Sequence, residues 1–372
     1  MNFIVATKPL CDGLNMIVLN QNVSAYYQKS CVAQITASDN TLTINTEAEG
    51  LLSELKLVGK ANEQGVASTI VDCITFKQIV NTIDASTITI EFIEGGIKLC
   101  AGKSKFSISQ VLDPNELTLR RPYDVTESSD PKVLDIHKDS WKFVKENQLY
   151  AISKNFMHPV YTYMWVSDTG AILTGDVTNG IFTQSTKNDL GITCLLKDTV
   201  VNLLESLPQD SHIYNVENHF VILAKTDSYS VTSEFIPVYE SNPDVGSYNS
   251  DVIFSILNID EESYLRTSVS ALTKVLNQIE LLNKGNKQTI PIEFGPQNIR
   301  FIDSYVDAEI PCTGNFNGDT QHAEFKIKFL KAALSHFDKD DIRLSLVYQN
   351  GTVSGLTVAT DELSVVIAAI DD

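Results

Sequence analysis

The sequence lacks the features that mark membrane, secreted and zinc-binding proteins. None of its apolar runs approaches 18 residues, and the first residues, "MNFIVATKPLCDGL", contain no basic segment followed by an apolar stretch. We therefore expect neither a membrane span nor a signal peptide. The six cysteines show no CxxC spacing, which predicts reduced thiols instead of a zinc site or a disulfide framework. Together these absences indicate a cytoplasmic protein.

Catalytic motifs are missing as well. The sequence contains neither GxSxG nor HExxH, and its six histidines are dispersed without a pair at metal-ligand spacing. We expect no enzyme, no metal site and no cofactor.

Positive charge is scarce. The chain carries 28 Lys and Arg against 47 Asp and Glu, a formal net charge of −19. This balance argues against a general nucleic-acid binder, because phosphate contacts need basic side chains. It leaves open a protein that concentrates its positive charge on one surface.

One segment looks like a phosphate-binding loop. Residues 94–106, "EGGIKLCAGKSKF", contain Gly102-Lys103-Ser104, the end of a Walker A motif. However, five residues separate Gly96 from Gly102 where that motif needs four, and the next residues, "KFSISQV", alternate as a strand does. The segment therefore predicts a β-hairpin, and we expect its lysines on the outer surface.

A threefold repeat organises the chain. Residues 76–111, 200–235 and 329–370 each read as a helix followed by three strands, with turns at Gly95-Gly96, Glu217-Asn218 and Asn350-Gly351. A block with helical spacing precedes each copy, at 7–19, 139–152 and 263–282, and polar linkers lie at 120–132 and 239–251. We predict an α+β protein with domains at 1–122, 133–245 and 252–372, each with two helices packed on antiparallel sheets.

Half of the 28 basic residues fall on the proposed helices and on the loops that follow each first helix. A shared helical face would then be positive and would attract a polyanion. A single helical lysine is otherwise an ordinary solvated residue, and Tyr161 and Tyr163 could equally begin a packed strand. The candidate contacts to a phosphate backbone or an unpaired base are Tyr26, Tyr27, Lys29, Lys77, Lys142, Lys145, Lys154, His158, Tyr161, Lys197, Arg266, Lys274, Lys284, Lys287 and Lys331.

The segments "GVASTIVDCITFKQIVNTI" and "ITIEFIEGGIKLCAGKSKFSIS" resemble bacterial DNA polymerase III beta subunits, the sliding clamps, and weaker similarity extends to the last strand, "LSVVIAAIDD". The resemblance implies a closed, head-to-tail ring of two chains whose twelve helices line a channel around duplex DNA. Such a ring slides without reading sequence and tethers the polymerase. Its implied partners are double-stranded DNA, a second copy, and a DNA polymerase and clamp loader that bind through short peptides.

The resemblance also implies two protein-binding surfaces. At the subunit interface, Phe106 and Ile108 would face Ile279, Leu281 and Leu282, although Phe106 and Ile108 also fit an ordinary strand core. The partner-peptide pocket would comprise Asp176, Val177, Asn179, Ile181, Pro243, Val245, Val366, Ala368 and Ile370.

The pocket departs from the family pattern. Ala368 and Ala369 stand where methionine and proline are usual, and "DVTNGI" replaces Thr-Asp-Gly-His-Arg-Leu. This divergence leaves the peptide specificity open. It also suggests a phage-encoded clamp, which would act in the host cytoplasm, or one from an unusual bacterium. The alternative function is a non-enzymatic, β-rich binding module for protein or carbohydrate with no DNA role.

Overall fold

A computed structural model of the 372-residue chain describes all residues except 18–31, 49–50, 116–117, 128–130, 156, 209–210, 217–218, 236, 240–244, 284–287, 304–305, 338–340 and 371–372. The chain forms two compact units. One comprises Met1–Lys138 and Thr199–Pro237, and the other comprises Asp139–Asp198 and Val238–Asp372. No helix in the described part of the chain is long and apolar enough to cross a membrane.

The first unit is built on a 13-stranded sheet in the order β10-β15-β16-β17-β4-β3-β2-β6-β9-β8-β7-β1-β5. Its strands are β1 (Asn2–Ala6), β2 (Val32–Ser38), β3 (Thr41–Ala48), β4 (Leu51–Val58), β5 (Lys60–Ala61), β6 (Val66–Asp72), β7 (Thr87–Ile93), β8 (Gly96–Ala101), β9 (Ser104–Leu112), β10 (Lys132–Leu134), β15 (His212–Val216), β16 (His219–Lys225) and β17 (Tyr229–Phe235).

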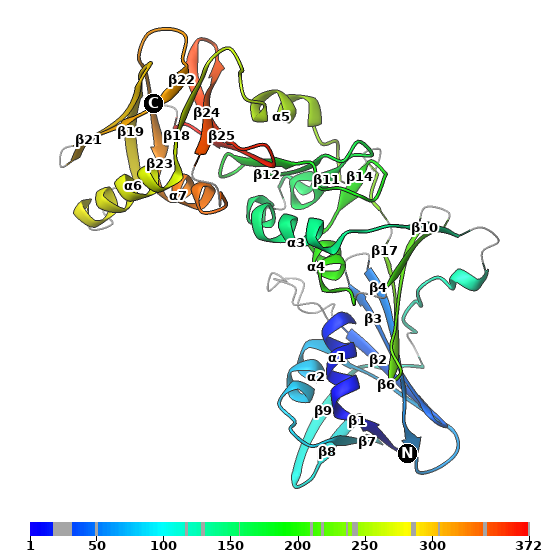
Figure 1. Ribbon diagram of the computed structural model, residues 1–372. Helices are drawn as coiled ribbons and strands as arrows, with labels where there is room; N and C mark the ends of the chain where they lie inside the picture. Colours follow the sequence, from blue (N-terminus) through cyan, green and yellow to red (C-terminus); the bar gives the residue numbers. More distant parts are fainter. Residues whose placement is uncertain are drawn as a thin grey trace. The chain divides into compact units, whose positions relative to one another are not determined.

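Helices α1 (Thr7–Ile17) and α2 (Cys73–Asn81) lie side by side in this unit (Figure 1). The Asp72 carboxylate caps α2 by accepting a hydrogen bond of 2.7 Å from the Thr75 backbone N–H, which satisfies one of the free donors at the helix start. Buried side chains of both helices pack with the strands in one apolar core. The unit also contains α4 (Asp198–Ser206) and a short 3₁₀ turn at Val125–Glu127.

The second unit contains a nine-stranded sheet, β14-β11-β12-β13-β26-β25-β24-β18-β22, and a four-stranded sheet, β21-β20-β19-β23. Its strands are β11 (Met164–Val166), β12 (Ile172–Asp176), β13 (Ile181–Ser185), β14 (Cys194–Leu196), β18 (Tyr264–Ser268), β19 (Thr289–Phe294), β20 (Asn298–Asp303), β21 (Val306–Pro311), β22 (Thr313–Asn315), β23 (Gln321–Lys326), β24 (Asp341–Gln349), β25 (Thr352–Ala359) and β26 (Leu363–Ala368).

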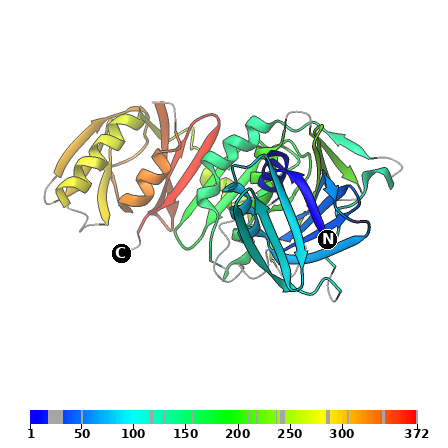
Figure 2. The same ribbon diagram turned by 90° about the horizontal axis from the view of Figure 1, so that it is seen from below.

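The helices of this unit are α3 (Lys138–Asn147), α5 (Ser250–Leu257), α6 (Val269–Asn283) and α7 (Ile327–Leu334), with 3₁₀ turns η3 (Leu149–Ala151) and η4 (Pro159–Thr162). Figure 2 shows α6 and α7 side by side, and an ion pair of 2.5 Å between Lys331 and Glu280 joins them. Their buried faces pack with one side of the nine-stranded sheet and with the four-stranded sheet. Ile253 and Leu257 of α5 pack in a separate cluster with Val366.

The strand pairings follow the predicted threefold repeat. In each repeat the strand before the first helix pairs with the strand after the second helix: β1 with β7, β10 with β15, and β18 with β24. The last strand of a three-stranded meander then pairs with a strand of the preceding repeat, β17 with β4 and β26 with β13. For this reason residues of the predicted middle domain contribute to both units.

The segment that resembled a phosphate loop is a hairpin, as predicted. Strands β7, β8 and β9 are joined by two short turns in which Gly95 and Gly102 have φ of +77° and +58°. These are values that glycine adopts without steric cost. The predicted type I′ turn is also present, with φ of +53° at Asn350 and +83° at Gly351. The predicted turn at Glu217-Asn218 lies outside the described residues.

Three predictions about local structure were wrong. Residues 264–268 form β18, so the helix predicted from 263 begins at Val269; the alternation of buried Leu265 and Thr267 is that of a strand. Residues 250–257, partly assigned to a linker, form α5, because Asn249 caps the helix and Ile253 and Leu257 lie one turn apart on a buried face.

The third wrong prediction concerns the cysteines. Cys11, Cys100, Cys194 and Cys312 are free thiols, but Cys73 is disulfide-bonded. Spacing along the sequence missed this bond, because a disulfide depends on distance in space.

Candidate nucleic-acid interface and partner surfaces

Exposed lysines lie on the outward sides of two amphipathic helices. On α3, Lys142 and Lys145 are exposed while Trp141 and Val144 are buried. On α6, Lys274 is exposed beside buried Val275. This is the 3.6-residue periodicity of a helix with one face in the core. These three lysines therefore lie where a polyanion could reach them.

Three other candidate lysines are already engaged or buried within the fold. Lys77 is only 8% exposed, and burial lowers the pKa of its ammonium. The Lys197 Nζ donates a hydrogen bond of 2.9 Å to the Thr162 hydroxyl and lies 3.8 Å from the centre of the Tyr163 ring. Lys331 forms the ion pair with Glu280. The sequence showed their charge but could not show these neighbours.

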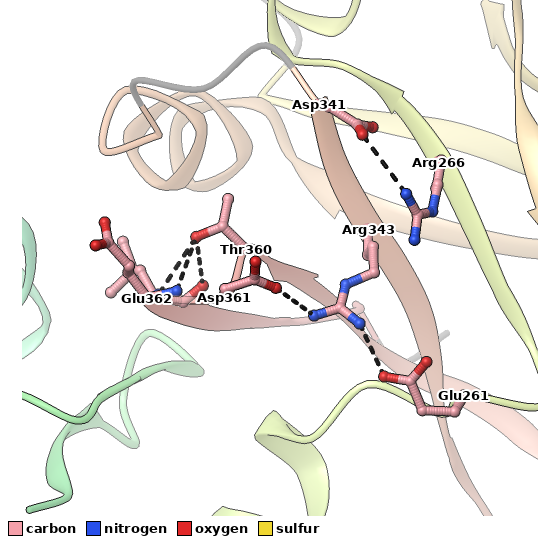
Figure 3. Close-up of polar contacts among 8 residues, drawn as sticks. Glu261, Arg266, Asp341, Arg343, Thr360, Asp361 and Glu362 are labelled. Atoms are coloured by element: carbon pink, nitrogen blue, oxygen red, sulfur yellow. Dashed lines mark hydrogen bonds and ion pairs between the residues drawn. The ribbon is translucent and has the colours of Figure 1, made fainter.

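Arg266 is placed on a strand, not on a helix as its position in the sequence suggested. It lies on β18 with its guanidinium 3.7 Å from the Asp341 carboxylate (Figure 3). Nearby, Arg343 of β24 contacts Glu261 at 2.8 Å and Asp361 at 3.3 Å. These pairs join the start of β18, β24 and the β25–β26 turn.

The loop candidates divide into exposed and packed residues. Lys154 and His158 are exposed. The Tyr161 ring packs against the rings of Phe182 and Tyr248, with centroids 6.1 and 5.1 Å apart, which fits the packed alternative. Tyr26, Tyr27, Lys29, Lys284 and Lys287 lie outside the described residues.

Two leucines of the predicted subunit interface are exposed. Leu281 and Leu282, at the end of α6, are 78% and 55% exposed, whereas Ile279 is buried in the core. On β9, Ile108 is also buried in the core and Phe106 packs partly against it. Residues 104–109 of β9 pair with β8, and no other described strand pairs with them.

The predicted peptide-pocket residues lie on two different faces of the nine-stranded sheet. Val366 pairs with Phe182, and both side chains lie in the cluster that α5 covers. Ile181 pairs with Ile367, and these two side chains lie in the core on the other face. Because side chains alternate along a strand, Ile181 does not share a face with Val366, whereas Phe182 does.

The remaining pocket candidates lie around the ends of β12, β13 and β26. The Asp176 carboxylate accepts hydrogen bonds from the Thr178 and Asn179 backbone N–H groups at 3.0 and 3.2 Å, so it holds the β12–β13 turn. Among the other candidates, Val177, Asn179 and Ala368 are exposed and Val245 is half-buried. The Ile370 backbone N–H donates a hydrogen bond to the Glu324 carbonyl. Pro243 lies outside the described residues.

An aromatic cluster covers the face of the nine-stranded sheet on which α5 packs. The sequence did not predict this cluster. Trp165 packs edge-on against Phe254 of α5 at 5.5 Å, and Tyr161 packs against both Phe182 and Tyr248. Tyr248 is 3% exposed, and burial raises its pKa. These aromatics are dispersed along the chain, and only the pairing of β13 with β26 and the position of α5 bring them together.

No cluster of three or more His, Cys, Asp or Glu suited to a metal ion occurs among the described residues. The described surface features are lysine-bearing helices, a strand edge on β9, two exposed leucines at the end of α6, and an aromatic cluster.

No family model matches the sequence, and no curated protein sequence matches it. Solved structures do match over the whole chain. A DNA polymerase III beta subunit from Thermotoga maritima shares 14% identity with a TM-score of 0.74, over 100% of this chain and 99% of that one.

Two further structures give the same result. A DNA polymerase III beta chain from Streptococcus pneumoniae shares 15% identity with a TM-score of 0.71, over 100% of both chains. A DNA polymerase sliding clamp from Bacillus subtilis shares 15% identity with a TM-score of 0.70, over 100% and 99%. The chain has the fold of the DNA polymerase III beta subunits, the sliding clamps.

Proposed function

We propose that this chain is a DNA sliding clamp: a ring of two copies that encircles duplex DNA and tethers a DNA polymerase without catalysing a reaction itself. The proposal rests on the pairing of strands from successive repeats, together with the clamp fold. Each of the two later repeats pairs its last meander strand with the repeat before it, β17 with β4 and β26 with β13.

The same rule predicts the contact between copies. The strand of the first repeat that corresponds to β17 and β26 is β9, and residues 104–109 of β9 pair with no described strand besides β8. The strand of the third repeat that corresponds to β4 and β13 is β21, which is an edge strand paired with β20. Pairing of β9 from one copy with β21 from a second copy would satisfy both edges and give six repeats in all.

Side chains near these edges support that pairing. Lys103 and Lys105 are exposed at the start of β9, and Glu309 is exposed on β21, where Asp307 is already paired with Arg300 at 2.6 Å. Opposite charges across an interface favour one register over others. The exposed pair Leu281 and Leu282 would add apolar area to the same contact.

The DNA-facing surface in this proposal includes Lys142, Lys145 and Lys274. A small number of exposed basic residues suits a protein that slides along DNA. Such residues contact phosphates and not bases, so they bind every sequence alike. Lys154 and His158 extend this surface on the loop after α3. Duplex DNA of any sequence is then the ligand.

We assign the partner-peptide site to the sheet face that carries the aromatic cluster, around Phe182, Val366 and Tyr248. Short peptides of a DNA polymerase and a clamp loader would dock there, as apolar side chains on a sheet face with few polar groups suit them. The ring would act in the cytoplasm of a bacterium or of a phage-infected host.

The test compares retention on closed circular and linear duplex DNA, with the ring loaded by a clamp loader or at high protein concentration. A ring stays on circles through gel filtration and is lost after the circle is cut. Equal retention on circular and linear DNA would contradict encirclement and would favour a binding module without a topological role.

A further inference from the structure

We propose that Tyr248 is a gate over the peptide site: its ring occupies, in the free chain, the place that a large apolar side chain of a partner peptide takes when bound. This inference rests on the proposed peptide site and adds how that site is regulated. It concerns a residue in the irregular segment before α5.

The ring lies directly on the sheet at a point where no side chain separates them. A Cβ at Gly175 would lie 2.4 Å from the Phe182 ring and 3.2 Å from the Tyr248 hydroxyl oxygen. Tyr161 packs against the Tyr248 ring from the side, at 5.1 Å between centroids. Tyr248 thus occupies a slot with aromatic walls and a glycine floor.

The polar hydroxyl of Tyr248 does not suit the apolar slot that its ring occupies. The Tyr248 hydroxyl is buried and has no hydrogen-bond partner among the described residues, and the same holds for the Trp165 indole N–H. A buried donor without an acceptor destabilises the closed arrangement, so phenylalanine would be the better side chain for a permanent core position. Two unsatisfied donors in an apolar cluster suit a peptide, which brings backbone carbonyl acceptors together with an apolar side chain.

The backbone next to Tyr248 is shaped like a hinge. Gly246 has φ of +87° and is exposed, and the Ser250 N–H donates to the Tyr248 carbonyl at 2.8 Å, which makes a tight turn just before the helix. Rotation in these few residues would move the ring into solvent while Asn249 still caps α5.

Small residues lie beside the slot and pack closely on one another. Gly355 pairs with Ala368, and a Cβ at Gly180 would lie 2.4 Å from the Ala368 Cβ. These three residues continue the face of Phe182 and Val366 toward the end of the sheet. Ala368 is exposed and carries only a methyl group, so a peptide backbone can approach the sheet there, next to the position that the Tyr248 ring vacates.

The experiment measures binding of a fluorescein-labelled octapeptide with a central Leu-Phe pair between Ser and Gly residues, with an Ala-Ala version as the specificity control. The apparent dissociation constant of a gated site is its intrinsic value divided by the open fraction. Tyr248→Ala removes the gate and should bind the Leu-Phe probe about tenfold more tightly than wild type. Tyr248→Phe removes only the unsatisfied hydroxyl, favours the closed state, and should bind about tenfold more weakly.

Tyr264→Phe, which removes a phenol hydroxyl on β18 outside the aromatic cluster, should bind as wild type does. Hydrogen exchange of residues 245–257 should rise when the probe is added. The gate is overturned if Tyr248→Ala binds no more tightly than wild type, or if Tyr248→Phe, which conserves the shape of the ring, binds equally well. Absence of probe binding to wild type and Tyr248→Ala alike overturns it too.

Retention on circular DNA separates the gate from the ring. When the circles are loaded at high protein concentration without a clamp loader, which would itself bind at the peptide site, all Tyr248 variants should remain on circles as wild type does. Normal retention with unchanged peptide binding would refute the gate alone. Loss of retention in wild type with the expected peptide affinities would refute encirclement and leave the gate supported.

Discussion

The ring of Tyr150 lies stacked on the imidazole of His336, with centroids 4.0 Å apart and planes inclined by 10°. Tyr150 belongs to η3 and His336 follows α7, so the stack joins the second and third repeats within one compact unit. Burial lowers the pKa of His336, and a hydrogen bond with the Glu146 backbone opposes this shift only in part.

This stack predicts a loss of stability in mild acid. Above the ordinary histidine pKa of about 6.5 the imidazole is neutral in both states. As the pH falls below that value, the unfolded chain takes up a proton that the folded chain binds only at a lower pH. The free energy of unfolding should therefore decrease through that window and level off below the folded pKa.

Urea unfolding at pH 7.5 and at pH 5.5 measures the effect. His336→Phe keeps a ring on Tyr150 and removes the titration, so it should lose less stability between the two pH values than wild type does. An unchanged pH dependence in His336→Phe would mean that other groups cause it.

If the proposed ring forms, the exposed leucines at the end of α6 should contribute to the contact between its two copies. Leu281→Asp with Leu282→Asp should weaken the dimer by about 100-fold or more, because burial of each leucine contributes roughly 1.5 to 3 kcal/mol. Light scattering after gel filtration should then give 41.1 kDa where wild type gives about twice that mass.

The melting temperature of each chain should hardly change, because both side chains are exposed in the free chain. Val58→Asp is the matched control, since Val58 is 75% exposed at the end of β4 and lies far in sequence from either proposed edge. A double variant that stays dimeric would rule these leucines out of the contact.

The helical lysines predict a salt-dependent DNA affinity. Lys145→Glu and Lys274→Glu should each weaken association with duplex DNA and reduce the slope of log affinity against log salt by about one. Fluorescence anisotropy at several salt concentrations measures both quantities. Lys225→Glu, a charge reversal at an exposed strand position on β16, should change neither. Equal effects at all three positions would mean that net charge alone, and not helix position, controls the affinity.

Two neighbouring glycines of the β7–β8 turn predict very different costs. Gly95→Ala meets no atom within 4 Å and costs only the positive φ, about 1 to 2 kcal/mol. Gly96→Ala would place its Cβ 2.2 Å from the Ile108 carbonyl oxygen, and this backbone clash adds roughly 1 to 3 kcal/mol. Urea unfolding of the two variants should therefore rank Gly96→Ala as clearly less stable; the reverse order would show that the β8–β9 pair can shift freely.

Much of the architecture follows from the sequence because it depends on local signals. Glycine turns at 95 and 102, the Asn350-Gly351 turn and the apolar spacing of the paired helices predicted the meanders, and the structure confirmed them. The start of α6 was wrong, because a short strand and a helix turn look alike over five residues.

The sites were less predictable, since they depend on which residues meet in space. Lys77 and Lys197 carry charge in the sequence, but burial and a neighbouring ring decide what that charge can reach. Ile181 and Phe182 differ by one position, and only the register with β26 shows which of them faces the aromatic cluster. Composition and spacing do not show which of two adjacent strand residues faces a given side of the sheet.

The pairing of each last meander strand with the preceding repeat has a consequence for assembly. A contact between β9 of one copy and β21 of the next uses two different surfaces, so it is heterologous, and nothing in the contact itself limits the number of copies. Copies joined in this way make a closed ring only if the turn per repeat sums to a full circle; otherwise they grow into a helical filament. The rotation within each chain and the angle at the joining edges together therefore decide between a two-membered ring and an endless polymer.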